Sequence, residues 1–180
     1  MEDRLEGERG GTPDPKMDKV TLKRIELLHP KLRGEALEIY KEICRRVNGK
    51  VLCRFSHTLR TNKEQDALYA KGRTAAGSIV TNAKGGQSYH NFALAVDIVM
   101  LLDKDGNGTY ESASWDTALD FDSDEKADWL EAVEVFKSYG WEHGGDWKFQ
   151  DKPHFQKTYG HSIKELQALP KDEDGYVVFS

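Results

Sequence analysis

The sequence predicts a single α+β domain, in which a small antiparallel sheet is covered on one side by helices. Its 180 residues suit one domain with one hydrophobic core. Residues 51–56 alternate apolar and polar side chains and residues 93–102 form a longer apolar run, so both segments predict strands. Apolar side chains recur at helical spacing in residues 32–47 and 129–136, which predicts helices that pack against the sheet.

Composition sets the boundaries of the domain and excludes several classes of partner. Residues 1–16 are charged and rich in Gly and Pro, which predicts a disordered leader before a domain that spans residues 17–180. The net charge is −5, so no global basic surface is available for nucleic acid. No apolar run is long enough for membrane insertion. Cys44 and Cys53 are interpreted as buried free thiols, with zinc ligation or a disulfide as minor alternatives.

The amino-terminal residues also bear on where the protein acts. They lack the apolar region of a signal peptide, so we expect synthesis in the cytoplasm. A substrate outside the cytoplasm would then require another route of release. The chain is expected to be a monomer.

Two helices are expected before the first strand. The first runs from Asp18 to Leu28 and is interrupted at His29 and Pro30, because proline disfavours the helical conformation of the residue before it. His29 is therefore interpreted as a helix-end residue. The second helix carries an apolar face made of Leu32, Ala36, Ile39, Tyr40, Ile43 and Val47.

The first strand leads into a helix with a defined start signal. The strand covers residues 51–56. Thr61 and Glu64, three residues apart, form a capping box for a helix that continues through Tyr69. This arrangement places Arg60 at the junction between strand and helix.

Four further segments complete the expected fold. A short strand is expected around residues 79–81. A helix is expected from Asp124 to Tyr139 with Asp122 among its cap residues. Residues 141–147 are expected to form a strand and loop, and residues 162–169 a short helix.

The stretch Q-S-Y-H-N-F-A-L-A-V-D-I-V-M-L-L places His90 and Asp97 at the entrance to and inside the central apolar run. A buried carboxylate needs an ion-pair, hydrogen-bond or metal partner, because leaving it unpaired is costly. His154 follows Pro153, which favours a turn into a short strand. Two His and one Asp leave an open fourth position on zinc, which is typical of catalytic zinc sites. The spacing leaves both Asp97 and Asp151 open as the carboxylate ligand.

The segment after the central strand matches the first half of a calcium-binding loop. Oxygen side chains occupy loop positions one, three, five and nine, namely Asp103, Asp105, Asn107 and Glu111. Position twelve is Ser114 rather than the bidentate glutamate, and no flanking EF-hand helices are predicted. A polar hairpin with Asp-Gly and Asn-Gly turns is the alternative. A weak calcium site and a plain hairpin both stay open.

Two separated motifs occur in the chain, S-x-H-x-x-x-x-A-x-D at residues 88–97 and D-x-P-H-F at residues 151–155. They resemble those of the M15 zinc peptidases, the group of D-Ala-D-Ala carboxypeptidases and L-alanyl-D-glutamate endopeptidases. The resemblance spans residues 54–156 and is stronger to the endopeptidase branch, which includes phage endolysins. Further matching positions are Leu59–Thr61, Gln65, Leu68–Ala70, Gly72–Thr74, Trp141 and Gly144–Trp147.

The resemblance implies the Hedgehog/D-Ala-D-Ala-peptidase fold and a zinc ion held by His90, Asp97 and His154. It implies that Asp151 is the general base, and later the general acid, of amide hydrolysis. The matching Arg60 stabilises the developing oxyanion or binds the substrate carbonyl.

The resemblance also implies a substrate, the amide between L-Ala and D-Glu in the peptidoglycan stem peptide. Gln65, Ser88 and Trp147 are candidate substrate-binding residues. The side chain of Ser88 can equally fix the turn before His90, and Trp147 can equally pack in the core. The expected role is cell-wall lysis or remodelling, with holin-type release if the gene is phage-derived.

Alternatives remain at the level of function and of ligands. The runner-up function is a D,D-carboxypeptidase or dipeptidase, and a further alternative is a non-catalytic binding module stabilised by zinc. His143 and His57 are competing ligand candidates. The sequence also departs from the family pattern at Ala93, where glycine is frequent, and at Thr58-Leu59, where Gly-Tyr is common.

Overall fold

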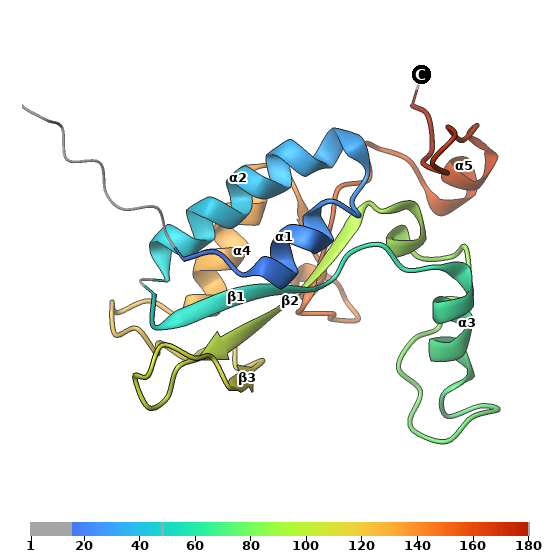
Figure 1. The fold of residues 1–180 in the computed structure, drawn as a ribbon. Coiled ribbons are helices and arrows are strands. Elements are labelled where there is room, and N and C mark those ends of the chain that lie inside the picture. Colours follow the sequence, from blue (N-terminus) through green and yellow to red (C-terminus); the bar gives the residue numbers. More distant parts are fainter. Residues whose placement is uncertain (1–15, 48, 180) are drawn as a thin grey trace, which may run out of the picture.

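The fold is described from a computed structural model that covers residues 16–47 and 49–179 (Figure 1). The expected leader, apart from Lys16, lies outside the described residues. No helix among the described residues is long and apolar enough to cross a membrane. Cys44 and Cys53 are buried and free, as predicted.

One antiparallel sheet organises the domain. Its five strands are β1 (Val51–His57), β2 (Ala95–Leu102), β3 (Ser112–Ser114), β4 (Glu142–His143) and β5 (His154–Gln156). The order is β1-β2-β5-β4, and β3 also pairs with β2. Because β1 and β3 both pair with residues 100–102 of β2, they must lie on opposite edges of that strand. β2 is therefore the central strand, and the predicted α+β fold with a small antiparallel sheet is confirmed.

Three helices form a layer over one face of this sheet (Figure 1). They are α1 (Lys19–Ile25), α2 (Pro30–Arg46) and α4 (Asp128–Ser138). α3 (Asn62–Ala70) and α5 (Ile163–Ala168) lie beside this layer, near the end of the sheet where β1 ends (Figure 1). The predicted capping box of Thr61 and Glu64 is present at the start of α3.

The two faces of β2 have different environments. Val96, Ile98 and Met100 pack in the main core with the helices, whereas Val99 and Leu101 form a second, smaller cluster. Side chains alternate along a strand, so the odd-numbered position 97 belongs to the face turned away from the helices. Asp97 is consequently directed away from the main core.

The prediction of a strand around residues 79–81 is wrong. No strand forms there, and Ile79 and Val80 are 57% and 58% exposed. The Arg73 guanidinium donates a hydrogen bond to the Thr81 carbonyl oxygen at 3.0 Å. A side chain rather than a neighbouring strand therefore satisfies this backbone group.

The predicted start of the helix after residue 123 is also wrong. α4 begins at Asp128, four residues later than expected, and its N-cap Ala127 makes no side-chain capping bond. Asp120 instead accepts backbone hydrogen bonds from residues 123, 124 and 125. The acidic residues before α4 therefore form a loop rather than its first turn.

The predicted hairpin at residues 103–111 is confirmed as a connection between β2 and β3. Asp103 accepts hydrogen bonds from the backbone nitrogens of Asn107 and Gly108 at 3.1 and 2.8 Å. Calcium binding by Asp103, Asp105, Asn107 and Glu111 stays a prediction.

Candidate metal centre

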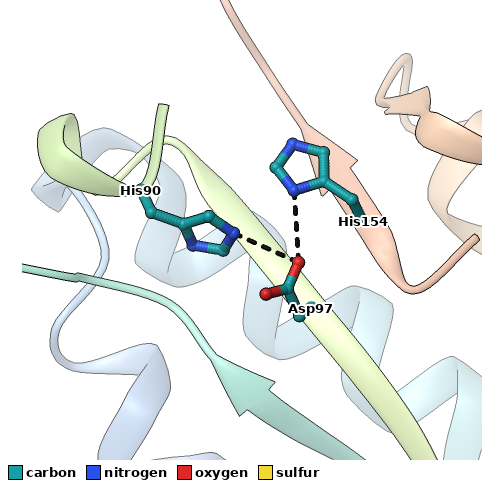
Figure 2. A group of neighbouring side chains, drawn as sticks. All are labelled: His90, Asp97 and His154. Atoms are coloured by element: carbon teal, nitrogen blue, oxygen red, sulfur yellow. Dashed lines mark hydrogen bonds and ion pairs between the residues drawn. The ribbon is translucent and has the colours of Figure 1, made fainter. Parts of the chain in front are cut away.

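Three side chains meet on the face of the sheet opposite the helices (Figure 2). Asp97 of β2 lies directly across from His154 of β5 in the strand register. His90 comes from the 3-10 turn η1 (Tyr89–Phe92), which precedes β2. Ala93 then adopts φ 58°, a left-handed conformation that turns the chain into the strand. This conformation explains why glycine suits position 93 and why the bend carries His90 toward Asp97.

Each histidine has one ring nitrogen held by an oxygen acceptor. His90 Nδ1 lies 2.7 Å from the Thr58 carbonyl oxygen, and His154 Nε2 lies 3.0 Å from Gln156 Oε1. These nitrogens must carry the protons, since a carbonyl oxygen can only accept. In the neutral rings, the lone pairs therefore lie on His90 Nε2 and His154 Nδ1.

Both lone pairs point at the same carboxylate oxygen. His90 Nε2 and His154 Nδ1 are each 3.1 Å from Asp97 Oδ1 (Figure 2). Candidate ligand atoms of the three residues all lie within 4.8 Å of one another. Three acceptors that converge in this way need a proton or a cation between them. Two imidazoles and a carboxylate are the donor set that zinc prefers, so the residues fit that metal.

The electrostatics of this centre favour an ionised carboxylate. Burial opposes ionisation of Asp97, but His154 and His90, when doubly protonated, donate hydrogen bonds that hold its pKa well below the ordinary value. Burial likewise lowers the pKa of His154, and the Asp97 carboxylate more than offsets it, so the net pKa is raised. The carboxylate is thus ionised at neutral pH and attracts positive charge.

Arg60 is the cation closest to this carboxylate on the α3 side. Its Nη2 lies 3.4 Å from Asp97 Oδ2, and its Nη1 donates to Gln65 Oε1 at 3.0 Å. Gln65 is fully buried and donates through its other amide atom to the Ala83 carbonyl at 2.8 Å. The structure therefore places Gln65 behind Arg60, as a positioning residue, rather than in the wall of the cleft.

Asp151 stands at the rim of the centre, on the turn that leads into β5. Its backbone nitrogen donates to the Gly144 carbonyl at 3.0 Å, and a Cβ at position 144 would collide with the Asp151 backbone. Partial burial raises the pKa of the Asp151 carboxyl; His154 opposes this shift and the Asp97 carboxylate adds to it. A carboxylate with a raised pKa is better suited to accept and return a proton near neutral pH.

A cleft of about 740 Å³ contains these groups. His90, Asp97, His154, Arg60 and Asp151 all line it. Arg60 is the only Lys or Arg among the described residues of its lining. The cleft thus joins the candidate metal ligands to one acid-base group and one cation.

Ser88 and Trp147, two of the expected substrate-binding residues, also line the cleft. The Ser88 hydroxyl accepts from the His90 backbone nitrogen at 3.3 Å, so it fixes the turn as well. Trp147 is 37% exposed, and its ring centroid lies 5.4 Å from that of His154. Its position is the wall of the cleft rather than the core.

Sequence reasoning missed three contributors to the site. Trp115 is 59% exposed and lines the cleft, and an isolated tryptophan in a polar loop gives no signal of this position. The Thr58 carbonyl is a backbone group without a sequence signature. Gln156 stands two residues after His154, and this same-face spacing on a strand was a usable signal.

The competing histidines lie outside the cluster. His143 is buried, its Nε2 lies 2.8 Å from the Lys152 carbonyl oxygen, and its ring stacks on Phe155. His57 lines the cleft, but its Nδ1 is 3.9 Å from Asp97 Oδ2 and its side chain is 60% exposed. Neither belongs to the group whose ligand atoms converge.

Comparison with known proteins supplies independent evidence on this segment. Residues 81–157, which carry His90, Asp97, Asp151 and His154, match the profile of a peptidase family described as D-alanyl-D-alanine carboxypeptidase. This segment is therefore similar to the M15 peptidases. The chain is also 52% identical over 98 residues to the peptidoglycan L-alanyl-D-glutamate endopeptidase CwlK of Bacillus subtilis strain 168.

The similarity covers only part of each chain. The alignment with the Bacillus protein covers 54% of this chain and 55% of that relative, so the chain spans about half the length of the curated protein it matches. The resemblance seen in the separated motifs is confirmed for the segment that holds the candidate metal centre.

Proposed function

We propose that this protein is a zinc-dependent peptidoglycan hydrolase that cleaves the amide between L-Ala and D-Glu of the stem peptide. The observation that carries this proposal is the convergence of His90 Nε2, His154 Nδ1 and Asp97 Oδ1 in one cleft. Asp151 and Arg60 line the same cleft and add the acid-base group and the cation that amide hydrolysis requires.

The proposed chemistry divides the work between the metal and the side chains. When bound to His90, Asp97 and His154, zinc lowers the pKa of water toward ~7 and polarises a carbonyl group. The Asp151 carboxylate accepts the proton of the attacking water and returns it to the leaving amine. Arg60, held by Gln65, is oriented to stabilise negative charge on the scissile carbonyl oxygen.

Substrate recognition must depend on local groups, because the chain has a net charge of −5 and the stem peptide is anionic. The cations Arg73 and Lys84 do not line the cleft. Arg73 instead donates to the Tyr69 and Thr81 carbonyls at 2.7 and 3.0 Å. We therefore keep Arg60 for the scissile carbonyl oxygen and assign the apolar contacts of the substrate to Trp115 and Trp147.

The choice of scissile bond rests on the relative from Bacillus subtilis, which is named for L-alanyl-D-glutamate endopeptidase activity. Digestion of purified peptidoglycan, followed by mass spectrometry of the released peptides, tests this choice. New peptides with D-Glu at the amino terminus are the expected products. Intact L-Ala-D-Glu bonds after prolonged digestion would contradict the proposal.

A second candidate function is D,D-carboxypeptidase activity, because the matching family profile is described as D-alanyl-D-alanine carboxypeptidase. The same digest distinguishes the two, since this activity releases free D-Ala and leaves the L-Ala-D-Glu bond intact. A non-catalytic zinc-stabilised module is less well supported, because such a site requires neither Asp151 nor Arg60 in its cleft.

Further parts of the proposal concern the state and place of action of the protein. We propose that it acts as a monomer on the cell wall. Gel filtration with light scattering checks the first statement, and a mass above that of one 20.4 kDa chain would contradict it.

A further inference from the structure

A second cluster of acidic side chains lies in the loop that leads into α4, outside the cleft lining. Asp120, Asp122 and Asp128 place carboxylate oxygens within 4.8 Å of one another, and so do Asp122, Asp124 and Glu131. Asp122 belongs to both groups. The five carboxylates therefore form one cluster within a stretch of twelve residues.

The buried members of this cluster have oxygens without partners. Asp122, Asp128 and Glu131 are only 4%, 2% and 4% exposed. Both carboxylate oxygens of Asp122, Oδ1 of Asp128 and Oε2 of Glu131 are buried without a hydrogen-bond partner in the described part of the chain. Buried polar atoms are normally paired, so an orphaned set on three neighbouring acids indicates a missing ligand.

No basic side chain in the described part of the chain forms an ion pair with these acids. None of the ion pairs among residues 16–47 and 49–179 involves the five carboxylates. The nearby Lys126 pairs with Glu134 instead, and Lys50 donates to the Asp122 carbonyl rather than to its carboxylate. Burial, reinforced by the neighbouring acids, raises the pKa of Asp122 to about 6 and that of Glu131 to about 7. The loop is thus arranged for a positive charge that residues 16–47 and 49–179 do not supply.

The spacing of these acids is that of a calcium-binding loop. Asp120, Asp122, Asp124, Asp128 and Glu131 occupy positions one, three, five, nine and twelve of a twelve-residue segment. Position six of such loops makes a sharp turn, and here Glu125 has φ 76°. α4 starts at position nine, so its first turn presents Asp128 and Glu131 to the loop.

We propose that residues 120–131 form a calcium-binding site. The donor set is all oxygen and rich in carboxylates, which suits calcium rather than zinc. Glu131 supplies the position that is a bidentate glutamate in EF-hand loops, and Lys126 stands at the position that contributes a backbone carbonyl.

The loop at residues 103–111 provides an internal comparison. Its acids Asp105 and Glu111 are exposed, and Asp103 already accepts two backbone hydrogen bonds from its own loop. Its position twelve is Ser114. Asp120 likewise accepts backbone hydrogen bonds, but only the loop at residues 120–131 has an acid at position twelve and buried carboxylate oxygens without a partner in the described part of the chain.

Calcium at this site would restrain a short segment that contributes to the wall of the cleft. Residues 115–127 connect β3 to α4, and Trp115 at the start of this segment lines the cleft. A cation that fixes residues 120–131 to the start of α4 also fixes one end of the segment that carries this wall residue.

The test is calcium binding by the full chain, loaded with zinc and kept in calcium-free buffer. Calorimetric titration with calcium chloride should give about one site per chain, and calcium should raise the melting temperature by mass action. Substituting exposed Asp124→Asn should weaken calcium binding by about tenfold or more. Glu131→Gln should abolish the rise while keeping a melting temperature without calcium no lower than that of the wild type, because it removes an uncompensated buried charge.

The matched control is Asp105→Asn in the earlier loop, which should bind calcium and respond in melting like the wild type. Absence of heat and of any melting shift at millimolar calcium would overturn the proposal. So would retention of the response in both Asp124→Asn and Glu131→Gln, or its loss in Asp105→Asn alone. An equal response to magnesium would refute the assignment to calcium.

Discussion

His90 and His154 each use one ring nitrogen to hold their orientation and direct the other toward Asp97. The Thr58 carbonyl and the Gln156 amide oxygen are the acceptors that set these orientations. Such partners fix the tautomer and the ring plane, and they make the free nitrogen a better ligand. The chemistry of the centre thus depends on residues that do not themselves belong to the ligand set.

Substituting His154→Ala should remove zinc from the purified protein, because a site with three protein ligands has no spare donor. His143→Ala is the matched control and should retain the metal, since its imidazole is bonded to the Lys152 carbonyl. Zinc content per folded chain, measured by elemental analysis, decides between them. Zinc retained in His154→Ala but lost in His143→Ala would transfer the ligand role to His143.

Substituting Asp151→Asn should preserve fold and zinc but slow hydrolysis by roughly 10²–10⁴-fold, the usual contribution of a general acid or base. Asp146→Asn is a suitable control, because Asp146 is not among the residues that line the cleft and it pairs with Lys137 at 2.6 Å. Turnover and zinc content should be measured on the same preparations. A metal-free Asp151→Asn protein would show that Asp151, rather than Asp97, is the carboxylate ligand.

Among the elements, α1 is anchored to β1 by one carboxylate. Asp18 caps the helix, accepts from Arg54 Nε and Nη2 at 2.8 and 2.9 Å, and is only 8% exposed. Burial alone would raise the pKa of Asp18, but the hydrogen bonds from Arg54 and Thr21 lower it overall. The ionised form is therefore the one that stabilises the contact between α1 and the sheet.

Asp18→Asn keeps a good capping residue but removes the charge that faces Arg54. We expect the free energy of unfolding at neutral pH to fall by about 1–2 kcal/mol, because water screens part of the interaction. The Arg54 side chain is 34% exposed. A carboxyl group with a lowered folded pKa stabilises above its unfolded value of about 3.9 and loses that effect as the pH falls. Urea unfolding of both proteins should therefore show a difference that shrinks below about pH 4. A difference that stays constant with pH would refute this account.

Elements with strong local signals were predictable from the sequence. The start of α3 was predictable from Thr61 and Glu64, because a capping box is a contact between residues close in sequence. β2 was predictable from its apolar run, and so was the place of His90 at the entrance to that run. In each case, residues close in sequence determine the structure.

The elements that were predicted wrongly depend on contacts between distant residues. Asp122 and Ser123 are good cap residues, but the same residue types form loops, and here the acids face one another instead of starting a helix. Ile79 and Val80 have strand-forming side chains but acquire no neighbouring strand. The position of Trp115 in the cleft wall follows from the tertiary fold alone.

At the scale of the whole molecule, stability and chemistry occupy opposite faces of one sheet. The main core joins α2 and α4 to the even-numbered side chains of β2, whereas Asp97 faces the cleft on the other side. Substitutions at the cleft can therefore change activity with little loss of packing. This separation makes zinc-dependent function testable in the intact, folded chain.

The most direct test of the account is the zinc dependence of bond cleavage. Protein stripped of zinc, then given increasing zinc, should digest purified peptidoglycan and generate D-Glu amino termini in proportion to bound metal. The yield should reach its plateau at about one zinc per chain. The Asp97→Ala variant should generate none under the same conditions. Cleavage by the zinc-free protein, or equal cleavage by Asp97→Ala, would contradict the account.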